Sequence, residues 1–313
     1  MKDILIYKED FLLSIKTNNY STETLYNYER DLQVFENFLE SDVKIDFEKI
    51  SKKTIELYKA YLTSRDRRTA SKDATERNLS AGSINRHLSS LRGYLRYLIE
   101  MDYKTPVLPQ NIKLVKMPKK APKVAELKDL IKLIESPALF EKNAMVAKRN
   151  RAMLEVLFAT GMRISELVSL NRAQIDQGGK IFIMGKGKKE RFVYLTPRAL
   201  RYVEEYLKTR RDDLPALFVP YRGRNSPNKN ARVSTNYLQA KIKFYRERLQ
   251  INVPTSAHSL RHGFATYLAE SGANPAAIQI LLGHESLDTT TRYVHASDYF
   301  AQETHDRYHP LKE

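Results

Sequence analysis

The sequence predicts a two-domain, mainly α-helical protein that carries one small β-hairpin. Three observations lead to this prediction. Apolar residues recur at helical spacing along most of the chain, a stretch rich in proline and lysine interrupts that spacing over residues 104–123, and near residue 180 the period changes to that of a strand. A chain of 313 residues is long enough for two domains that each bury a core.

Residues 1–103 form the first predicted domain, which we expect to be helical. A hydroxyl cap at Ser21 precedes a run with helical apolar spacing, and a second helix is predicted from Ser51. Residues 64–80 are polar and lack any period, which is typical of an exposed loop.

A third helix of this domain is predicted to begin near Ser83. One side of it is apolar and the other is basic, with Arg86, His87, Arg92 and Arg96 outside the apolar side. Such a helix can pack on a bundle while it faces a phosphate backbone, although an ordinary solvated helix has the same pattern. Arg86 is therefore a candidate DNA contact.

Residues 104–123 are predicted to link the two domains. Pro106, Pro109, Pro118 and Pro122 alternate with lysines there. Proline at this density favours an extended, semi-rigid connection, and the lysines could follow a DNA backbone.

Residues 124–313 form the second predicted domain, which combines helices with the hairpin. Strands are predicted over 180–184 and 191–195, joined by a turn at 185–189. Helices are predicted over residues 127–134, 153–170, 198–210, 235–249, 259–271 and 275–282.

The composition restricts the classes of function. A formal net charge of +16 favours a polyanionic partner such as nucleic acid, although a solvated basic surface is the alternative. The absence of cysteine excludes disulfides, thiolate metal sites and cysteine nucleophiles. No apolar run approaches the roughly 18 to 20 residues that span a bilayer, and the N-terminus lacks the features of a signal peptide. We therefore expect a cytoplasmic protein without a membrane partner.

Residues that can carry chemistry gather in five ordered motifs of the second domain. A tyrosine can attack phosphorus, arginines and histidines can neutralise the charge that develops, and a lysine can protonate the departing oxygen. Together these groups suit the cleavage of a phosphodiester without a metal ion. The motifs are Ala159–Leu167, Gly185–Arg191, His258–His262, Leu281–His284 and Thr289–Tyr293.

In order and interval, these motifs resemble those of the tyrosine recombinase (phage integrase) family, most closely its Xer branch. The terminal His309 and Pro310 are similar to the ending of Xer proteins. The resemblance covers the whole chain, with the specific motifs in residues 159–310. It implies a two-domain clamp on DNA, in which a SAM-like core-binding domain precedes an α+β catalytic domain whose tail contacts a neighbouring protomer. Packing of that tail within its own chain is the alternative.

The resemblance also implies a role for each site residue. Tyr293 is the implied nucleophile, which forms a 3′-phosphotyrosyl bond and releases a 5′-hydroxyl. Arg163 and Arg261 resemble the two arginines that clamp the non-bridging oxygens, and arginine suits this because its planar fork directs two hydrogen bonds. Glu166, three residues after Arg163 on the same helical face, is expected to pair with it and orient it.

Lys186 matches the general acid of the family, and His258 and His284 are the implied hydrogen-bonding partners of the phosphate. Histidines are also frequent structural residues, so that alternative stays open for both. His258 and His262 have the i, i+4 spacing of some zinc sites, but no glutamate lies between them and Arg261 would repel a cation. Further candidate DNA contacts, besides Arg86, are Lys188, Arg191 and Lys241.

The implied partner is a double-stranded DNA recombination site, bound by a dimer, with a homotetramer on two synapsed sites. We expect no metal and no nucleotide cofactor. Within the Xer branch the implied role is chromosome dimer resolution near the nucleoid, with a paralogous recombinase and a DNA translocase as further partners. Two alternatives stay open: the integrase of a phage or mobile element, and a binding protein that has lost catalysis.

Overall fold

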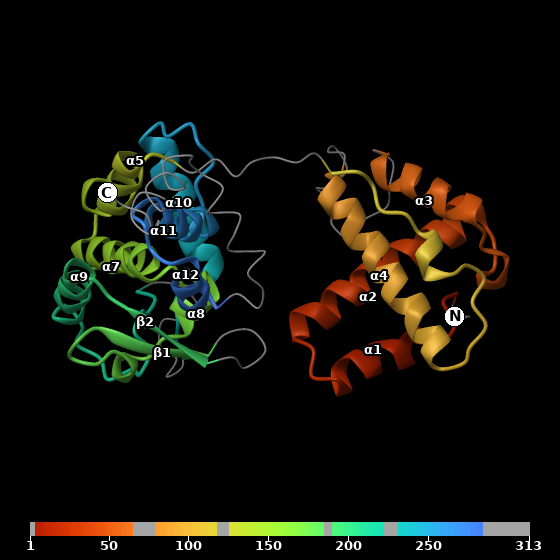
Figure 1. Ribbon diagram of the computed structural model, residues 1–313, viewed down its shortest axis with the longest axis horizontal. Coiled ribbons are helices and arrows are strands. Elements are labelled where there is room, and N and C mark those ends of the chain that lie inside the picture. Colours follow the sequence, from red (N-terminus) through yellow and green to blue (C-terminus); the bar gives the residue numbers. More distant parts are fainter. Residues whose placement is uncertain (1–3, 65–78, 118–124, 185–189, 222–230, 284–313) are drawn as a thin grey trace, which may run out of the picture. The chain divides into compact units, whose positions relative to one another are not determined.

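The computed structural model describes residues 4–64, 79–117, 125–184, 190–221 and 231–283. The chain divides into two compact units, residues 1–120 and 121–313, and each is considered by itself. Both units are mainly helical, and a two-stranded antiparallel sheet lies in the second (Figure 1). The predicted fold class is thus confirmed. No helix within the described ranges is long and apolar enough to cross a membrane.

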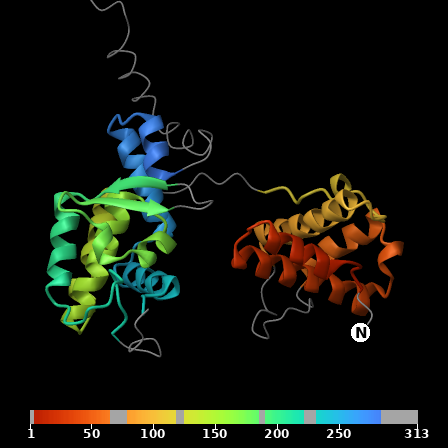
Figure 2. The same cartoon turned by 90° about the horizontal axis from the view of Figure 1, so that it is seen from below.

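The first unit is a helical bundle in which α2 and α4 pack against each other and α1 and α3 contact both (Figure 2). Ser21 caps α2 as predicted, because its hydroxyl accepts from the Thr24 amide at 3.1 Å. Ser80 caps α4, so this helix begins two residues before the predicted start. The helices are α1 (Lys8–Thr17), α2 (Thr22–Phe38), α3 (Lys52–Thr63) and α4 (Ala81–Glu100), with short turns at Leu39–Val43, Phe47–Lys49 and Pro109–Asn111.

Residues 104–117 differ from the extended linker that the prolines predicted. Val107 and Ile112 are buried in the core of the first unit. Asn85 of α4 also makes two hydrogen bonds with the Val115 backbone, at 2.9 and 2.7 Å. The apolar residues between the prolines make this segment part of the first unit, so the division between the units falls at residues 120 and 121.

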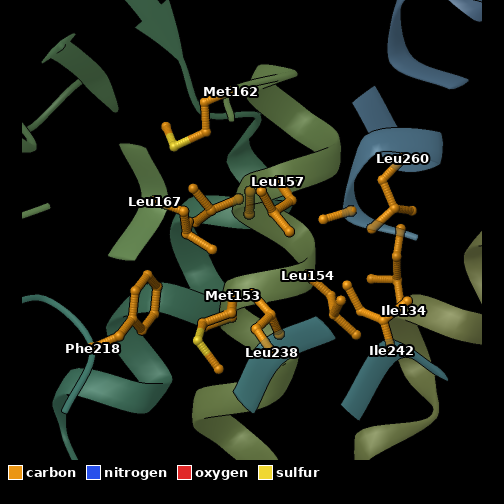
Figure 3. Packing of buried hydrophobic residues seen from close by; sticks show 14 of the residues in the cluster. Ile134, Met153, Leu154, Leu157, Met162, Leu167, Phe218, Leu238, Ile242 and Leu260 are labelled. Atoms are coloured by element: carbon orange, nitrogen blue, oxygen red, sulfur yellow. The ribbon is translucent and has the colours of Figure 1, made fainter. Parts of the chain in front are cut away.

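The second unit is built around α7 (Ala144–Thr160), which contacts α5, α6, α8, α9, α11 and β2. Figure 3 shows Met153, Leu154 and Leu157 of this helix surrounded by apolar side chains from other elements. α7 is buried on most sides, and its buried residues include the charged Arg149, Arg151 and Glu155 beside the apolar ones. These charged side chains are hydrogen-bonded, as burial requires. The remaining helices are α5 (Leu127–Glu135), α6 (Pro137–Phe140), α8 (Ile164–Ser169), a short turn at Arg172–Gln174, α9 (Pro197–Leu207), α10 (Thr235–Arg248), α11 (Ala257–Glu270) and α12 (Pro275–Leu282).

The predicted hairpin is present as β1 (Lys180–Met184) and β2 (Glu190–Tyr194), with Phe182 opposite Phe192. Buried and exposed residues alternate along both strands, as expected for a sheet with one face on the core. In β2 the buried face carries Arg191 and Val193. Figures 1 and 2 show that this strand lies next to α12.

The single helix predicted over residues 153–170 is wrong. Two helices occupy this region, because Gly161 ends α7 in the left-handed conformation with φ of 60°. A Cβ atom at this position would also lie 2.3 Å from the Phe264 ring, so no other residue fits without movement. The chain therefore changes direction just before Arg163, and this turn determines where the Arg163 backbone lies at the start of α8.

Candidate active site

Arg163 lies in the turn between α7 and α8, where it is the N-terminal capping residue of α8. Its amide donates to Glu166 Oε2 at 2.7 Å and its guanidinium donates to Glu166 Oε1 at 3.1 Å. The ion pair expected between the two residues is therefore present. About a third of the Arg163 side-chain surface (36%) is exposed to solvent, so the side chain can still reach a ligand outside the domain.

Arg261 of α11 is buried, with 5% of its surface exposed. Its two terminal nitrogens donate to the carbonyl oxygens of Gly161, at 2.7 Å, and Leu282, at 2.6 Å. These carbonyls end α7 and α12, so one guanidinium joins the ends of two helices. Because Gly161 is two residues before Arg163, the same contact brings the two predicted phosphate-binding arginines into one region.

His258 lies one helical turn before Arg261 and approaches His262, with 2.7 Å between the Nε2 atoms. Burial lowers the pKa of His258, and the positive charges of Arg261 and Arg163 lower it further. The ring is therefore neutral near pH 7 and carries one N–H donor and one acceptor nitrogen. Within the described ranges, no group of three or more His, Cys, Asp or Glu side chains could hold a metal ion.

Arg191 of β2 has a role that the sequence interpretation missed. The side chain is buried, with 7% exposure, and its terminal nitrogens donate to both carboxylate oxygens of Glu166, at 3.0 and 2.8 Å. Its Nε donates to the Leu281 carbonyl at 2.9 Å. The structure thus gives Arg191 an internal role in place of the predicted DNA contact. The alternation along the strand, which pairs Arg191 with the buried Val193, is the sequence signal that could have indicated it.

Two other predicted DNA contacts are paired within their own units. Arg86 donates to Asp31 at 2.5 Å, and Lys241 contacts Glu141 at 2.7 Å. Their side chains keep 40% and 27% of their exposure, respectively. Both contacts with DNA stay predictions.

Several predicted site residues lie outside the described residues. In the sequence, His284 directly follows the last described residue, Gly283, and Lys186 comes two residues after the end of β1. Their roles therefore stay predictions here. The residues concerned are Lys186, Lys188, His284 and Tyr293.

The described part of the site contains two arginines and a neutral histidine, drawn from α11 and from the turn after α7. Fixed donors of this kind stabilise the charge on a phosphorus centre during transfer. In a chain with a net charge of +16, these groups suit a protein of the class that transfers phosphoryl groups on nucleic acid.

The chain belongs to the phage integrase family, whose members are the tyrosine recombinases. The model of that family matches residues 124–299, and the model of the phage integrase N-terminal SAM-like domain matches residues 9–101. Transesterification through a tyrosine is characteristic of this family, so the chain is an enzyme of that type.

Curated relatives agree with this assignment over nearly the whole chain. Tyrosine recombinase XerC of Myxococcus xanthus is 32% identical, covering 93% of this chain and 92% of the relative. Tyrosine recombinase XerD of Oceanobacillus iheyensis is 31% identical, covering 96% and 97%. Tyrosine recombinase XerD of Staphylococcus epidermidis is 30% identical and covers 93% of both.

Solved structures share the fold at lower identity. XerH bound to its difH substrate has a TM-score of 0.70 at 23% identity, covering 95% of this chain and 84% of that one. The Tn1549 transposon integrase with transposon end DNA has a TM-score of 0.68 at 18% identity, covering 95% and 97%. A lambda integrase dimer on a core site has a TM-score of 0.66 at 15% identity, covering 91% and 75%.

Proposed function

We propose that this protein is a site-specific DNA recombinase of the Xer type, which cuts and rejoins strands through a 3′-phosphotyrosyl intermediate. The observation that carries the proposal is the junction at Gly161, where Arg261 holds the turn that presents Arg163. Two residues 98 positions apart in the numbering are thereby brought to one cationic centre, in a chain about 30% identical to Xer recombinases.

In the proposed reaction the Tyr293 phenol oxygen attacks the scissile phosphorus and forms a phosphotyrosyl ester with the 3′ end. The bond from phosphorus to the 5′ oxygen breaks, and Lys186 gives that oxygen a proton. Since the ester conserves the energy of the broken bond, a 5′-hydroxyl from another strand can reverse the step without ATP. A phenol has a pKa of about 10, so the tyrosine must lose its proton as it attacks.

The remaining groups stabilise the charge that develops at phosphorus. Arg163 and Arg261 are the proposed partners of the non-bridging oxygens, because guanidinium groups stay charged and direct paired hydrogen bonds. His258, held neutral by burial and by the two nearby arginines, can donate or accept a hydrogen bond without adding charge. His284 is proposed to donate to a phosphate oxygen. No metal or nucleotide takes part in these steps.

The proposed assembly has a dimer on each DNA site and a tetramer on two synapsed sites, which exchange strands through a Holliday junction. The part of this proposal with a dimer on one site is supported by the lambda integrase dimer, which is bound to a core site. A cytoplasmic location at the nucleoid, a paralogous recombinase and a DNA translocase are part of the same proposal. The similarity to Xer proteins is the reason for proposing them.

The biological role that we propose is the resolution of chromosome dimers. A second candidate is the integration of a mobile element, which is favoured by the similarity to the Tn1549 transposon integrase. The location of the DNA site distinguishes the two. A palindromic site near the replication terminus supports the first role, and sites at the ends of a mobile element support the second.

The test of the proposed function is the trapping of a covalent intermediate. Duplexes that bind the chain are selected from random sequences, and a nick is placed near the cleavage position so that the short 5′-hydroxyl strand diffuses away. We expect a denaturation-resistant adduct joined to the 3′ phosphate, formed in the presence of EDTA. A 5′ linkage, a requirement for a divalent metal, or binding without any adduct would contradict the proposal.

Lys186→Ala is expected to slow cleavage on ordinary DNA but to cleave normally when sulfur replaces the bridging 5′ oxygen. A thiolate leaves without a proton, so this substrate no longer needs the general acid. The loss on ordinary DNA should be about 10²- to 10⁴-fold, which is typical of proton transfer by a positioned group. The first-order rate of adduct formation measures both effects. Lys188→Ala is the control, and slow cleavage of both substrates by Lys186→Ala would assign the acid to another residue.

A further inference from the structure

We infer that Arg191 is a positioning residue for catalysis, which fixes Arg163 through Glu166 and holds the end of α12 beside them. The inference rests on the proposed function, since the direction of Arg163 matters only if that residue acts on a phosphate. It replaces the role in DNA contact that the sequence predicted for Arg191.

The Glu166 carboxylate bridges the two arginines with both of its oxygens. Oε1 accepts from Arg163 at 3.1 Å and from Arg191 at 3.0 Å. Oε2 accepts from the Arg163 amide at 2.7 Å and from the other terminal nitrogen of Arg191 at 2.8 Å. This planar, two-pronged pairing fixes the orientation of the carboxylate, which in turn fixes both the backbone and the side chain of Arg163.

Charge balance explains why a second arginine is needed. Burial raises the pKa of Glu166, but hydrogen bonds and charge from Arg191 and Arg163 outweigh it and lower that pKa overall. The carboxylate therefore stays ionised. Without Arg191, Arg163 would be the only arginine paired with Glu166. The carboxylate would then bind Arg163 more strongly and compete with a phosphate for it. With Arg191 present, Arg163, Arg191 and Glu166 carry a net charge of about +1. Because Arg191 is buried, the partly exposed Arg163 is the cation that can meet a phosphate.

The third contact of Arg191 connects the Arg163–Glu166–Arg191 group to the end of α12. Its Nε donates to the Leu281 carbonyl at 2.9 Å, while Arg261 donates to the neighbouring Leu282 carbonyl at 2.6 Å. Carbonyls at a helix C-terminus carry partial negative charge, so two buried cations stabilise this end. Gly283 packs closely on the guanidinium, since a Cβ there would lie 3.0 Å from Arg191 atoms. Arg191 thus joins the motifs around Arg163 and Gly283.

The test compares Arg191→Met with Arg151→Met, a matched change elsewhere in the same unit. Arg151 is also 7% exposed and donates to the buried Glu155 at 2.8 Å, but none of its contacts reaches the candidate site. We expect Arg191→Met to lower the adduct rate at saturating DNA by about 100-fold, as misplacement of a catalytic group does. The affinity for the selected duplex should not change, and Arg151→Met should retain both values.

A DNA contact by Arg191 would give the opposite pattern. The affinity of Arg191→Met would fall, the salt dependence of binding would lose about one unit of slope, and the saturated rate would be unchanged. That result, or equal rates for Arg191→Met and Arg151→Met, would overturn the inference. Thermal unfolding shows whether each variant folds. If Arg191→Met does not, Arg191→Lys is measured in its place with the same expectation, because lysine keeps the charge but cannot bridge both oxygens.

A double variant separates positioning from independent effects. Because Arg191 acts on Arg163 through Glu166, Glu166→Gln combined with Arg191→Met should be no slower than the slower single variant. Multiplied losses would mean that the two residues act separately. The wild-type chain shows whether the inference or the proposed function has failed. If the proposed function is wrong, the wild-type chain forms no adduct; if only the inference is wrong, the wild-type chain still forms it.

Discussion

Tyr293→Phe is expected to form no covalent adduct with DNA while it still binds the selected duplex. The phenol oxygen is the atom that becomes part of the phosphotyrosyl ester, so its removal leaves no group to make the bond. A suicide duplex analysed under denaturing conditions measures the adduct, and binding of the intact duplex is measured in parallel. An adduct that persists would assign the nucleophile to another of the 19 tyrosines.

The structure reduces the number of competing tyrosines. Tyr94, Tyr206 and Tyr245 are fully buried, so their hydroxyls are not accessible to DNA in the folded protein. Burial also raises the pKa of each phenol, which makes it a poorer nucleophile. Tyr267 of α11 provides the matched control, since it lies in the helix that carries His258 and its hydroxyl donates to the Ala125 carbonyl at 3.0 Å. Tyr267→Phe loses only hydrogen bonds to the backbone of Ala125 and Leu127, which lie outside the candidate site, so it should form the adduct at the wild-type rate.

Arg261→Ala is expected to be the second most damaging change, because it removes a charge and a structural contact together. The saturated rate of adduct formation should fall on the order of 100-fold or more, as when a preorganised donor at a transition state is lost. The change also leaves the Gly161 and Leu282 carbonyls without this donor. The expected loss in the free energy of unfolding is about 1 to 3 kcal/mol for each unsatisfied buried acceptor.

Arg210→Ala separates these two effects. The Arg210 side chain is 1% exposed and donates to the carbonyls of Ala216 and Leu217, and it also pairs with Asp212. It therefore satisfies buried carbonyls as Arg261 does, but away from the candidate site. Its removal should lower stability in denaturant titrations but leave the adduct rate unchanged in the folded fraction. If the two variants lose catalysis equally, Arg261 acts only through stability and has no role at the phosphate.

Local structure was predictable wherever local chemistry decides it. The helix α2 follows from the Ser21 cap and the apolar period after it, and the pairing of β1 with β2 follows from two strand periods separated by a short segment with two glycines. The family could also be identified from the sequence, because five motifs at matching intervals are specific. These features depend on neighbours within a few residues or on the linear order of motifs.

Prediction failed where a distant contact decides the structure. The prolines in residues 104–117 favoured an extended linker, but burial of Val107 and Ile112 against the first bundle outweighs that preference. The apolar period over residues 153–170 continued past Gly161, but the packing of Phe264 against that glycine and its left-handed conformation end the helix there. Intrinsic propensity is a weak term, and tertiary packing overrides it.

The sequence by itself determined the helical fold class, the order of the motifs, and the residue types able to transfer a phosphoryl group. Only the tertiary structure decided which charged groups meet. Arg191 and Glu166 are 25 residues apart, and Arg261 and Gly161 are 100 apart. The physical reason is that burying a charge is costly unless a partner is within reach, and packing alone brings such partners together. A basic residue next to a motif can therefore contact DNA or hold the site in place, and its burial distinguishes the two roles.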